Sequence, residues 1–264
     1  IVNINGNSYR LKNKIKIVVS IIGATLLFLV SAFYLELDFV TFFERGAEAG
    51  NVISNFMVIN TQDIGEISAQ LLVSIAMAIA SLLIGILLSF IFSILGASNI
   101  APSKLLSTFI KSGVSIIRAI PSLVWVLMIV ASLGFGSVAG VVGLVFPTVG
   151  YLTKSFISSI EEVPEEMIET MRATGASWLQ LVFEGVLPNV SQAFTTWIAI
   201  RLEANVAESI SLGMVGAGGI GTVLSRAISS YNYGKISMCI ICIFMTMLLF
   251  ELSMGQVKKK QKIG

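Results

Sequence analysis

Several polar side chains interrupt an otherwise apolar stretch, residues 190–212, which is predicted to be a membrane-spanning helix. Arg201, Asn205 and Glu208 are spaced four and three residues apart, so they share one face of such a helix. Glu203 lies on another face and is expected to meet a neighbouring helix. Charged groups are costly inside a bilayer, which makes residues of this kind candidates for function.

Three interpretations of this polar face are open. In the first, Arg201 pairs with Glu208 or Glu203 in a structural network that fixes helix packing. In the second, Arg201 lines a path for an anion, because arginine is well suited to oxyanions. The two nearby acids argue against a tight anion site at this position. In the third, the helix is misplaced and the polar face meets water.

A second candidate region is the acidic segment 155–188, which carries six glutamates. Pro164 suits the first turn of a helix and Gly175 its end. Ser177 and Gln180 have the form of a capping box that opens a second short helix, which Pro188 is expected to close. This pattern predicts a helix–Gly–helix loop with one apolar side, formed by Met167, Ile168, Met171, Trp178, Leu181 and Val182.

The apolar side of this loop needs a partner. A hairpin lying on the membrane is one alternative, but interfacial helices are usually rich in Lys and Arg. An acidic hairpin would be repelled by anionic lipid, so a protein partner is favoured.

Two short motifs resemble cofactor or redox sites but lie in the wrong context. Residues 216–221 match G-x-G-x-x-G, yet a dinucleotide site needs a preceding strand and an acid about 20 residues further on. Here a membrane helix precedes the glycines and an apolar helix follows them, so a turn is predicted. Cys239 and Cys242 form C-x-x-C inside that apolar helix and are interpreted as small buried hydrophobes.

Composition excludes other classes of site. The sequence has no histidine, two cysteines and a net charge of +2, which argues against a His-based metal site, a disulfide framework and a nucleic-acid partner. The P-loop pattern G-x-x-x-x-G-K-[ST] does not occur in it. We therefore expect no cofactor and no metal in this chain, and we expect any ATP and Mg to be bound by another polypeptide.

The elements that must position these residues are membrane helices. Of the 264 residues 55% are hydrophobic and 12% charged, and the mean hydropathy is +0.91, which is more apolar surface than a soluble core of this size could bury. About 20 apolar residues span a bilayer. The sequence thus predicts an all-α polytopic protein in a lipid bilayer with about six spans, over residues 17–35, 71–95, 119–133, 138–154, 190–212 and 236–250.

The distribution of Lys and Arg predicts the orientation, since these residues collect on the cytoplasmic side. The N-terminal tail has four, segment 99–118 has three and the C-terminal tail has four, whereas segment 36–66 has only Arg45. Six alternating spans then place both termini in the cytoplasm and residues 36–66 outside. The acidic loop falls on the cytoplasmic side.

The loop also carries a spacing that is typical of one family. Glu169, Gly175 six residues later, and then Leu187-Pro188 resemble the "EAA" loop of the permease subunits of bacterial ABC importers. The chain departs from that motif at the two alanines, which are Thr170 and Met171, and at its usual isoleucine, which is Gly185. The strings RATGASWLQLVFEGVLPNV and RLEANVAESISLGMVGAGGIG look most like the phosphonate-importer permeases.

The resemblance implies a type I ABC-importer permease fold and a set of partners. In such importers two permease subunits, identical or closely related, form the pore. The EAA loop of each docks onto a cytoplasmic ABC ATPase dimer, and an extracytoplasmic solute-binding protein delivers the solute. By resemblance the coupling positions are Glu169, Ala173, Gly175, Ala176, Leu187 and Pro188. Candidates for the translocation path are Arg201, Asn205, Glu208, Gly216, Gly218 and Gly219.

The expected organisation and function follow. Residues 1–66 are expected to hold a tail, the first span and an extracytoplasmic segment; residues 67–254 the transporter domain; and residues 255–264 a basic cytoplasmic tail. The chain is expected to be a multi-pass permease of the cell membrane and not an enzyme, carrying a phosphonate-type oxyanion. A permease of a methionine or other amino-acid importer is the alternative. An ion-coupled secondary transporter is less favoured, because the two halves show no internal repeat.

Overall fold

The computed structural model describes residues 5–58 and 60–261, which are helical in all their regular elements. The chain divides into two compact units, Ile1–Ser54 and Asn55–Gly264. The first unit contains α1 (Asn5–Tyr34), whose apolar part Lys14–Tyr34 is long enough to cross a membrane, in the place of the first predicted span.

A second helix, α2 (Phe39–Phe56), follows in a segment for which no helix was predicted. Asp38 begins it by accepting hydrogen bonds from the backbone N–H groups of Val40 and Thr41 at 3.0 and 3.1 Å. The Thr41 hydroxyl and these N–H groups hold the pKa of the Asp38 carboxyl below its ordinary value.

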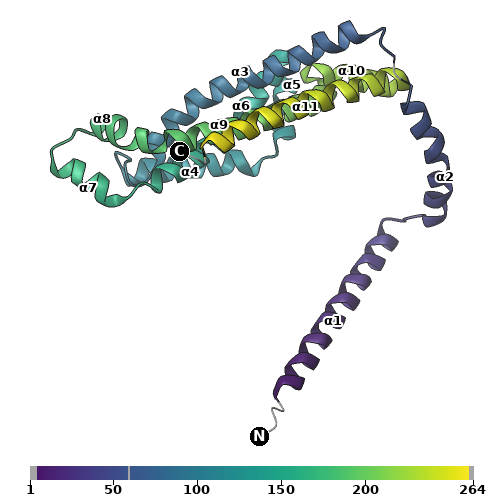
Figure 1. The fold of residues 1–264 in the computed structure, drawn as a ribbon, viewed down its shortest axis with the longest axis horizontal. Helices are drawn as coiled ribbons and strands as arrows, with labels where there is room; N and C mark the ends of the chain where they lie inside the picture. The colour runs from purple at the N-terminus through teal and green to yellow at the C-terminus, as the bar shows by residue number, and fades with distance from the viewer. Residues whose placement is uncertain (1–4, 59, 262–264) are drawn as a thin grey trace. The chain divides into compact units, whose positions relative to one another are not determined.

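The second unit is built around three long helices that pack along one another (Figure 1). They are α3 (Ile64–Gly96), α6 (Ser137–Glu161) and α9 (Leu187–Leu212). More than half of the most apolar part of α6 is buried, so α6 is the central helix of the bundle. The last helix, α11 (Tyr233–Gln261), packs on α9 and α3, and its backbone stays helical into the predicted tail.

Two further spans are broken. Helix α4 (Lys104–Ala119) meets α5 (Ser122–Leu133) at an angle of 86°, and the helical path Trp178–Ala217 meets α10 (Ile220–Ser229) at 56°. The first break falls at Pro121, which forces extended backbone on Ile120 before it. Within the described residues, four helices are long and apolar enough to span a membrane singly. If each bent pair is counted as one span, the number of spans is six.

The prediction of a single span over residues 119–133 was therefore wrong in detail. Helix α5 has only 12 residues, too few to cross a bilayer alone, and α4 occupies what was predicted to be a cytoplasmic segment. The three basic residues of α4 led to this error, since charge was used to mark the ends of spans. The predicted turn at Gly134 and Gly136 is present, and both glycines have positive φ.

The acidic loop contains α7 (Glu165–Ala173) and α8 (Trp178–Gln180), joined through Gly175. The predicted capping box of Ser177 and Gln180 is formed. Pro188, however, does not close the second helix. A π-helical turn, η1 (Leu181–Val186), precedes the proline and accommodates its lack of an N–H donor. The helix therefore continues directly into α9.

The predicted apolar side of this loop faces inward. Ile168, Leu181 and Val182 are at most 2% exposed and belong to the core cluster that also contains Phe156 of α6 and Phe194 of α9. The chain's own helices therefore cover these three residues of the side for which a protein partner was expected, whereas Trp178 of the same side stays exposed. The surface left for a partner consists of the acids of α7 and a few exposed apolar residues: Trp178, Leu179 and Phe183.

Candidate functional site

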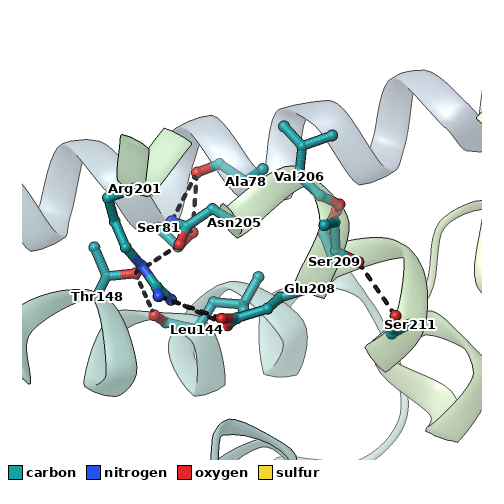
Figure 2. Close-up of polar contacts among 11 residues, drawn as sticks. Ala78, Ser81, Leu144, Thr148, Arg201, Asn205, Val206, Glu208, Ser209 and Ser211 are labelled. Carbon is teal, nitrogen blue, oxygen red and sulfur yellow. Dashed lines mark hydrogen bonds and ion pairs between the residues drawn. The ribbon is translucent and has the colours of Figure 1, made fainter. Parts of the chain in front are cut away.

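Arg201, Asn205 and Glu208 of α9 form a polar cluster with residues of α3 and α6 (Figure 2). Arg201 forms a two-pronged ion pair with Glu208, two turns further along the same helix, with N–O distances of 3.2 and 3.0 Å. Its Nε lies 3.4 Å from the Thr148 hydroxyl, and its guanidinium lies 5.8 Å from the centre of the Tyr151 ring. Both of these partners belong to α6.

Asn205 is the centre of the same cluster and links three helices. Its amide nitrogen donates to Ser81 Oγ at 3.1 Å and to the Ala78 carbonyl of α3 at 3.4 Å. Its amide oxygen lies 3.1 Å from the Thr148 hydroxyl of α6. Hydrogen bonds between membrane helices stabilise their packing, so Asn205 holds α3, α6 and α9 together at one level.

Burial distinguishes the members of the cluster. Asn205 is fully buried and Arg201 is 6% exposed, whereas the side chain of Glu208 is 27% exposed. An arginine whose fork is occupied by a carboxylate on the same helix has few donors left for a passing anion. Helix α9 lies where it was predicted, and the geometry favours the structural interpretation of Arg201 over the path-lining one. Glu203 lies on another face, is half-buried and also has an interaction partner.

The glycine-rich segment after α9 is a turn, as predicted. It contains the kinked π turn η2 (Gly213–Ala217), and Gly216, Gly218 and Gly219 have φ of +100°, +88° and +75°. Ser74 of α3 caps the following helix by accepting the N–H of Ile220 at 3.0 Å. A hollow of about 630 Å³ opens beside the turn; its lining includes Phe135, Gly136, Gly216, Gly218, Thr222 and Arg226.

A charged cluster lies at the α10 end of the unit and had not been predicted. Lys235 at the start of α11 pairs with Glu66 of α3 at 2.6 Å and with Asp63, the residue before α3, at 3.5 Å. Arg226 of α10 lies 3.8 Å from the same Glu66. These contacts tie the ends of three helices together at the end opposite to α7 and α8 (Figure 1).

Comparison with known proteins assigns the family. Residues 92–262 match the family described as binding-protein-dependent transport system inner membrane component. The chain belongs to this family. It is thus a multi-pass permease component of the inner membrane and a transporter subunit, not an enzyme.

Two curated permeases are similar over most of this chain. The phosphite transport system permease protein PtxC of Stutzerimonas stutzeri is 32% identical over 189 residues, which are 72% of this chain and 69% of that protein. The phosphate-import permease protein PhnE of Mycolicibacterium smegmatis is 30% identical over 187 residues, 71% of this chain but only 35% of that protein. This chain therefore spans about a third of the length of the mycobacterial relative.

Among solved structures, an inward-facing structure of the MetNI methionine ABC transporter is similar with a TM-score of 0.67. The match is 22% identical in sequence and covers 77% of this chain and 99% of the solved chain. At that identity the match speaks for the fold alone. The permease therefore has the type I importer fold.

With the permease fold in place, the residues of the loop motif can be located. Glu169 and Ala173 are exposed on α7, and Gly175 has φ of +82°, which permits the sharp turn between α7 and α8. Ala176 and Leu187 are half-buried and Pro188 is exposed. The loop thus presents Glu169 and the Gly175 turn outward, away from the core cluster.

Two of the three departures from the family motif, Met171 and Gly185, pack against each other. A Cβ atom added at Gly185, where the motif has isoleucine, would overlap the Sδ atom of Met171, which replaces a motif alanine. The larger residue at one position therefore fills the space that is vacated at the other. The loop therefore stays well packed, with the large side chain on α7 (Met171) and the small residue on η1 (Gly185).

Several polar residues of the permease core were missed from sequence because they are single hydroxyls in apolar helices. Thr148, Ser81 and Ser74 are all fully buried and all bond to residues of the candidate site or its turn. A signal was present in α3, where small residues recur at three, four or seven positions and mark a close-packed face. They are Ser74, Ser81, Gly85, Ser89, Ser93 and Gly96.

Proposed function

We propose that this chain is the permease subunit of an ATP-driven importer for a phosphonate-type oxyanion, that is phosphonate, phosphite or phosphate. The observation that carries the substrate class is the similarity, at about 30% identity, to permeases named for phosphite and phosphate transport. The sequence strings around Gly185 and Gly216, which resemble the phosphonate branch, point the same way.

The proposed assembly contains two permease subunits, identical or closely related, a cytoplasmic ATPase dimer and an extracytoplasmic solute-binding protein. ATP and Mg are bound by the ATPase. Its closure pushes on α7 and α8, and helices carry that displacement well because packed elements move as rigid bodies. Support comes from the exposed Glu169 and the Gly175 turn, which stand outside the core on a loop whose other side is firmly packed.

In this proposal the solute passes close to the glycine turn at Gly216, Gly218 and Gly219, beside the hollow near Phe135. Irregular backbone is tolerated at membrane depth where it lines a cavity. Arg201 acts as the fixed partner of Glu208 and not as an anion ligand. The partly exposed Glu208 is the member of the cluster closest to a path-lining role. Both termini and the α7–α8 loop are on the cytoplasmic side.

An importer of methionine or another amino acid is the second candidate, because the fold match is to a methionine transporter. Titration calorimetry on the solute-binding protein that co-purifies with the permease separates the two. We expect tight binding of a phosphonate, phosphite or phosphate and no heat with methionine. Tight binding of an amino acid together with no affinity for any of the three phosphorus oxyanions would overturn the substrate assignment.

A further inference from the structure

The turn between α3 and α4, residues 97–103, is hydrogen-bonded to the loop that contains α7 and α8. The turn precedes this loop by more than 60 residues in the sequence. We propose that this turn is a second mechanical connection between the ATPase-facing loop and the membrane helices, with Arg172 and Trp178 as its positioning residues. The inference rests on the proposed function, since it assumes that α7 and α8 receive the ATPase stroke.

Two donors from the loop meet two consecutive carbonyls of the turn. Arg172 of α7 donates to the Asn99 carbonyl at 3.0 Å. The indole N–H of Trp178 in α8 donates to the Ile100 carbonyl at 2.7 Å. The two donors lie on either side of the Gly175 bend, so α7 and α8 each make one hydrogen bond to the turn.

The turn is also anchored on its far side. Glu161 at the end of α6 accepts the Ser98 N–H at 2.8 Å and pairs with Lys111 of α4 at 2.6 Å. The Asn99 amide donates to the Ile160 carbonyl at 2.8 Å. These contacts connect the turn to α4 and α6, and the hydrogen bonds of Arg172 and Trp178 connect the loop to the same turn.

Ile100, in the same turn, is 1% exposed and part of the core cluster that includes Ile168 of the loop. A hydrogen bond is lost once donor and acceptor separate beyond about 3.5 Å. A displacement of the loop by a few ångströms must therefore either carry the turn with it or break both bonds and expose this core.

The route from the turn leads to the candidate site. Helix α3 runs without a break from the turn to Ser81, which bonds Asn205, and on to Ser74, which caps α10 at the glycine turn. A push on the turn along α3 thus reaches both polar contacts. The covalent connections of the loop lead into α6 and α9, so the turn adds α3, the third helix of the site, to the elements that the loop can move.

The Asn99 side chain adds a second acceptor at the same place. Its Oδ1 atom is buried and has no hydrogen-bond partner among the residues that the structure describes. It belongs to the residue whose carbonyl already holds Arg172. The guanidinium has five N–H donors, so Arg172 has donors left for this second acceptor in the same residue.

The test uses Arg172→Ala, Trp178→Phe and the double variant in proteoliposomes that contain the complete importer. Phenylalanine keeps an aromatic ring and removes the N–H. The measured quantity is solute transported per ATP hydrolysed, with ATP hydrolysis stimulated by loaded binding protein recorded separately. We expect each single change to lower the transport ratio by about fivefold, the factor typical of one lost hydrogen bond, while stimulated hydrolysis persists.

Two matched controls make the result specific. Trp125→Phe removes another indole hydrogen bond, from α5 to the Ile117 carbonyl at 3.2 Å, and should leave the ratio unchanged. Arg172→Lys keeps one charged donor and should restore part of the ratio that Arg172→Ala loses. An unchanged ratio in the double variant, or an equal fall with Trp125→Phe, would overturn the proposal.

A distance measurement tests the connection without removing it. Spin labels at Pro102 in the turn and Thr174 in the loop, in a chain with Cys239 and Cys242 replaced by alanine, should keep their separation when ATP binds. A change of several ångströms would show that the two parts move independently and would contradict the inference. Absence of ATP-driven uptake in the unaltered importer would instead contradict the proposed function, so the two failures are distinguishable.

Discussion

At the level of single residues, the ion pair of Arg201 and Glu208 joins two turns of α9, and Arg201 also bonds Thr148 of α6. Removal of one member of a buried pair leaves an uncompensated charge and costs roughly 3–5 kcal/mol in soluble proteins. Because the Glu208 side chain is 27% exposed, its removal should lie toward the lower end of that range.

The prediction is a double-mutant cycle with Arg201→Met, Glu208→Gln and both together. Each single variant should lower the thermal stability of the purified permease, and the double variant should recover most of the loss, because no unpaired charge remains. Stability is read from the unfolding temperature in detergent, alongside transport. Additive losses of stability, with transport lost only where Arg201 is missing, would contradict the structural role and favour the anion path.

Gly175 provides a second prediction, which depends on its backbone alone. Its φ is +82° and a Cβ atom there would have open space around it. Gly175→Val should strain the bend by about 1–2 kcal/mol and uncouple ATP hydrolysis from transport, whereas Gly175→Asn should be tolerated because asparagine adopts positive φ more readily. Equal behaviour of the two variants in a coupled transport assay would show that the conformation of the bend does not matter.

At the level of elements, the contact between α7 and η1 explains how the loop keeps its shape with an altered motif. Gly185→Ile should overpack the space held by Met171 and destabilise the permease by roughly 1–3 kcal/mol, and Met171→Ala should leave a cavity. The double variant Met171→Ala with Gly185→Ile, which restores the family pattern at both positions, should be more stable than either single variant. Unfolding temperatures check this, and a double variant less stable than both singles would contradict it.

The sequence was sufficient for the elements that obey local rules. The capping box at Ser177 and the glycine bends follow from backbone preferences and were predicted correctly. Pro188 was wrongly predicted to end the helix. The π turn before it accommodates a residue without an N–H donor, and this turn could not be predicted from the sequence. The burial of Ile168, Leu181 and Val182 under the chain's own helices was not predicted, because hydrophobicity alone does not say whether a covering surface comes from the same chain or from another.

The same distinction applies to the candidate site. Spacing along α9 was enough to place Arg201, Asn205 and Glu208 on one face. Their partners Thr148 and Ser81 come from helices more than 50 residues away, and a single hydroxyl in an apolar helix is a weak signal by itself. Tertiary contacts of this kind required the structure.

At the level of the whole molecule, the proposed orientation assigns opposite sides to the two ends of the second unit. Thr174 in the loop and Ser229 at the end of α10 are both exposed. In cells that carry the permease without its native cysteines, Ser229→Cys should react with a membrane-impermeant maleimide, and Thr174→Cys should react only after permeabilisation, because the two lie on opposite sides of the membrane. The reverse pattern would show that the orientation is inverted.

The central claim is that this permease moves a phosphorus oxyanion when its partner hydrolyses ATP, and uptake into proteoliposomes tests it most directly. The purified importer is supplied with ATP and with labelled phosphonate, phosphite, phosphate or methionine, and Glu169→Lys is run beside it with Glu184→Lys as a charge-matched control on η1. We predict ATP-dependent accumulation of at least one phosphorus oxyanion, none of methionine, loss of uptake with Glu169→Lys and retention with Glu184→Lys. ATP-dependent accumulation of methionine without any of the three oxyanions would contradict the account.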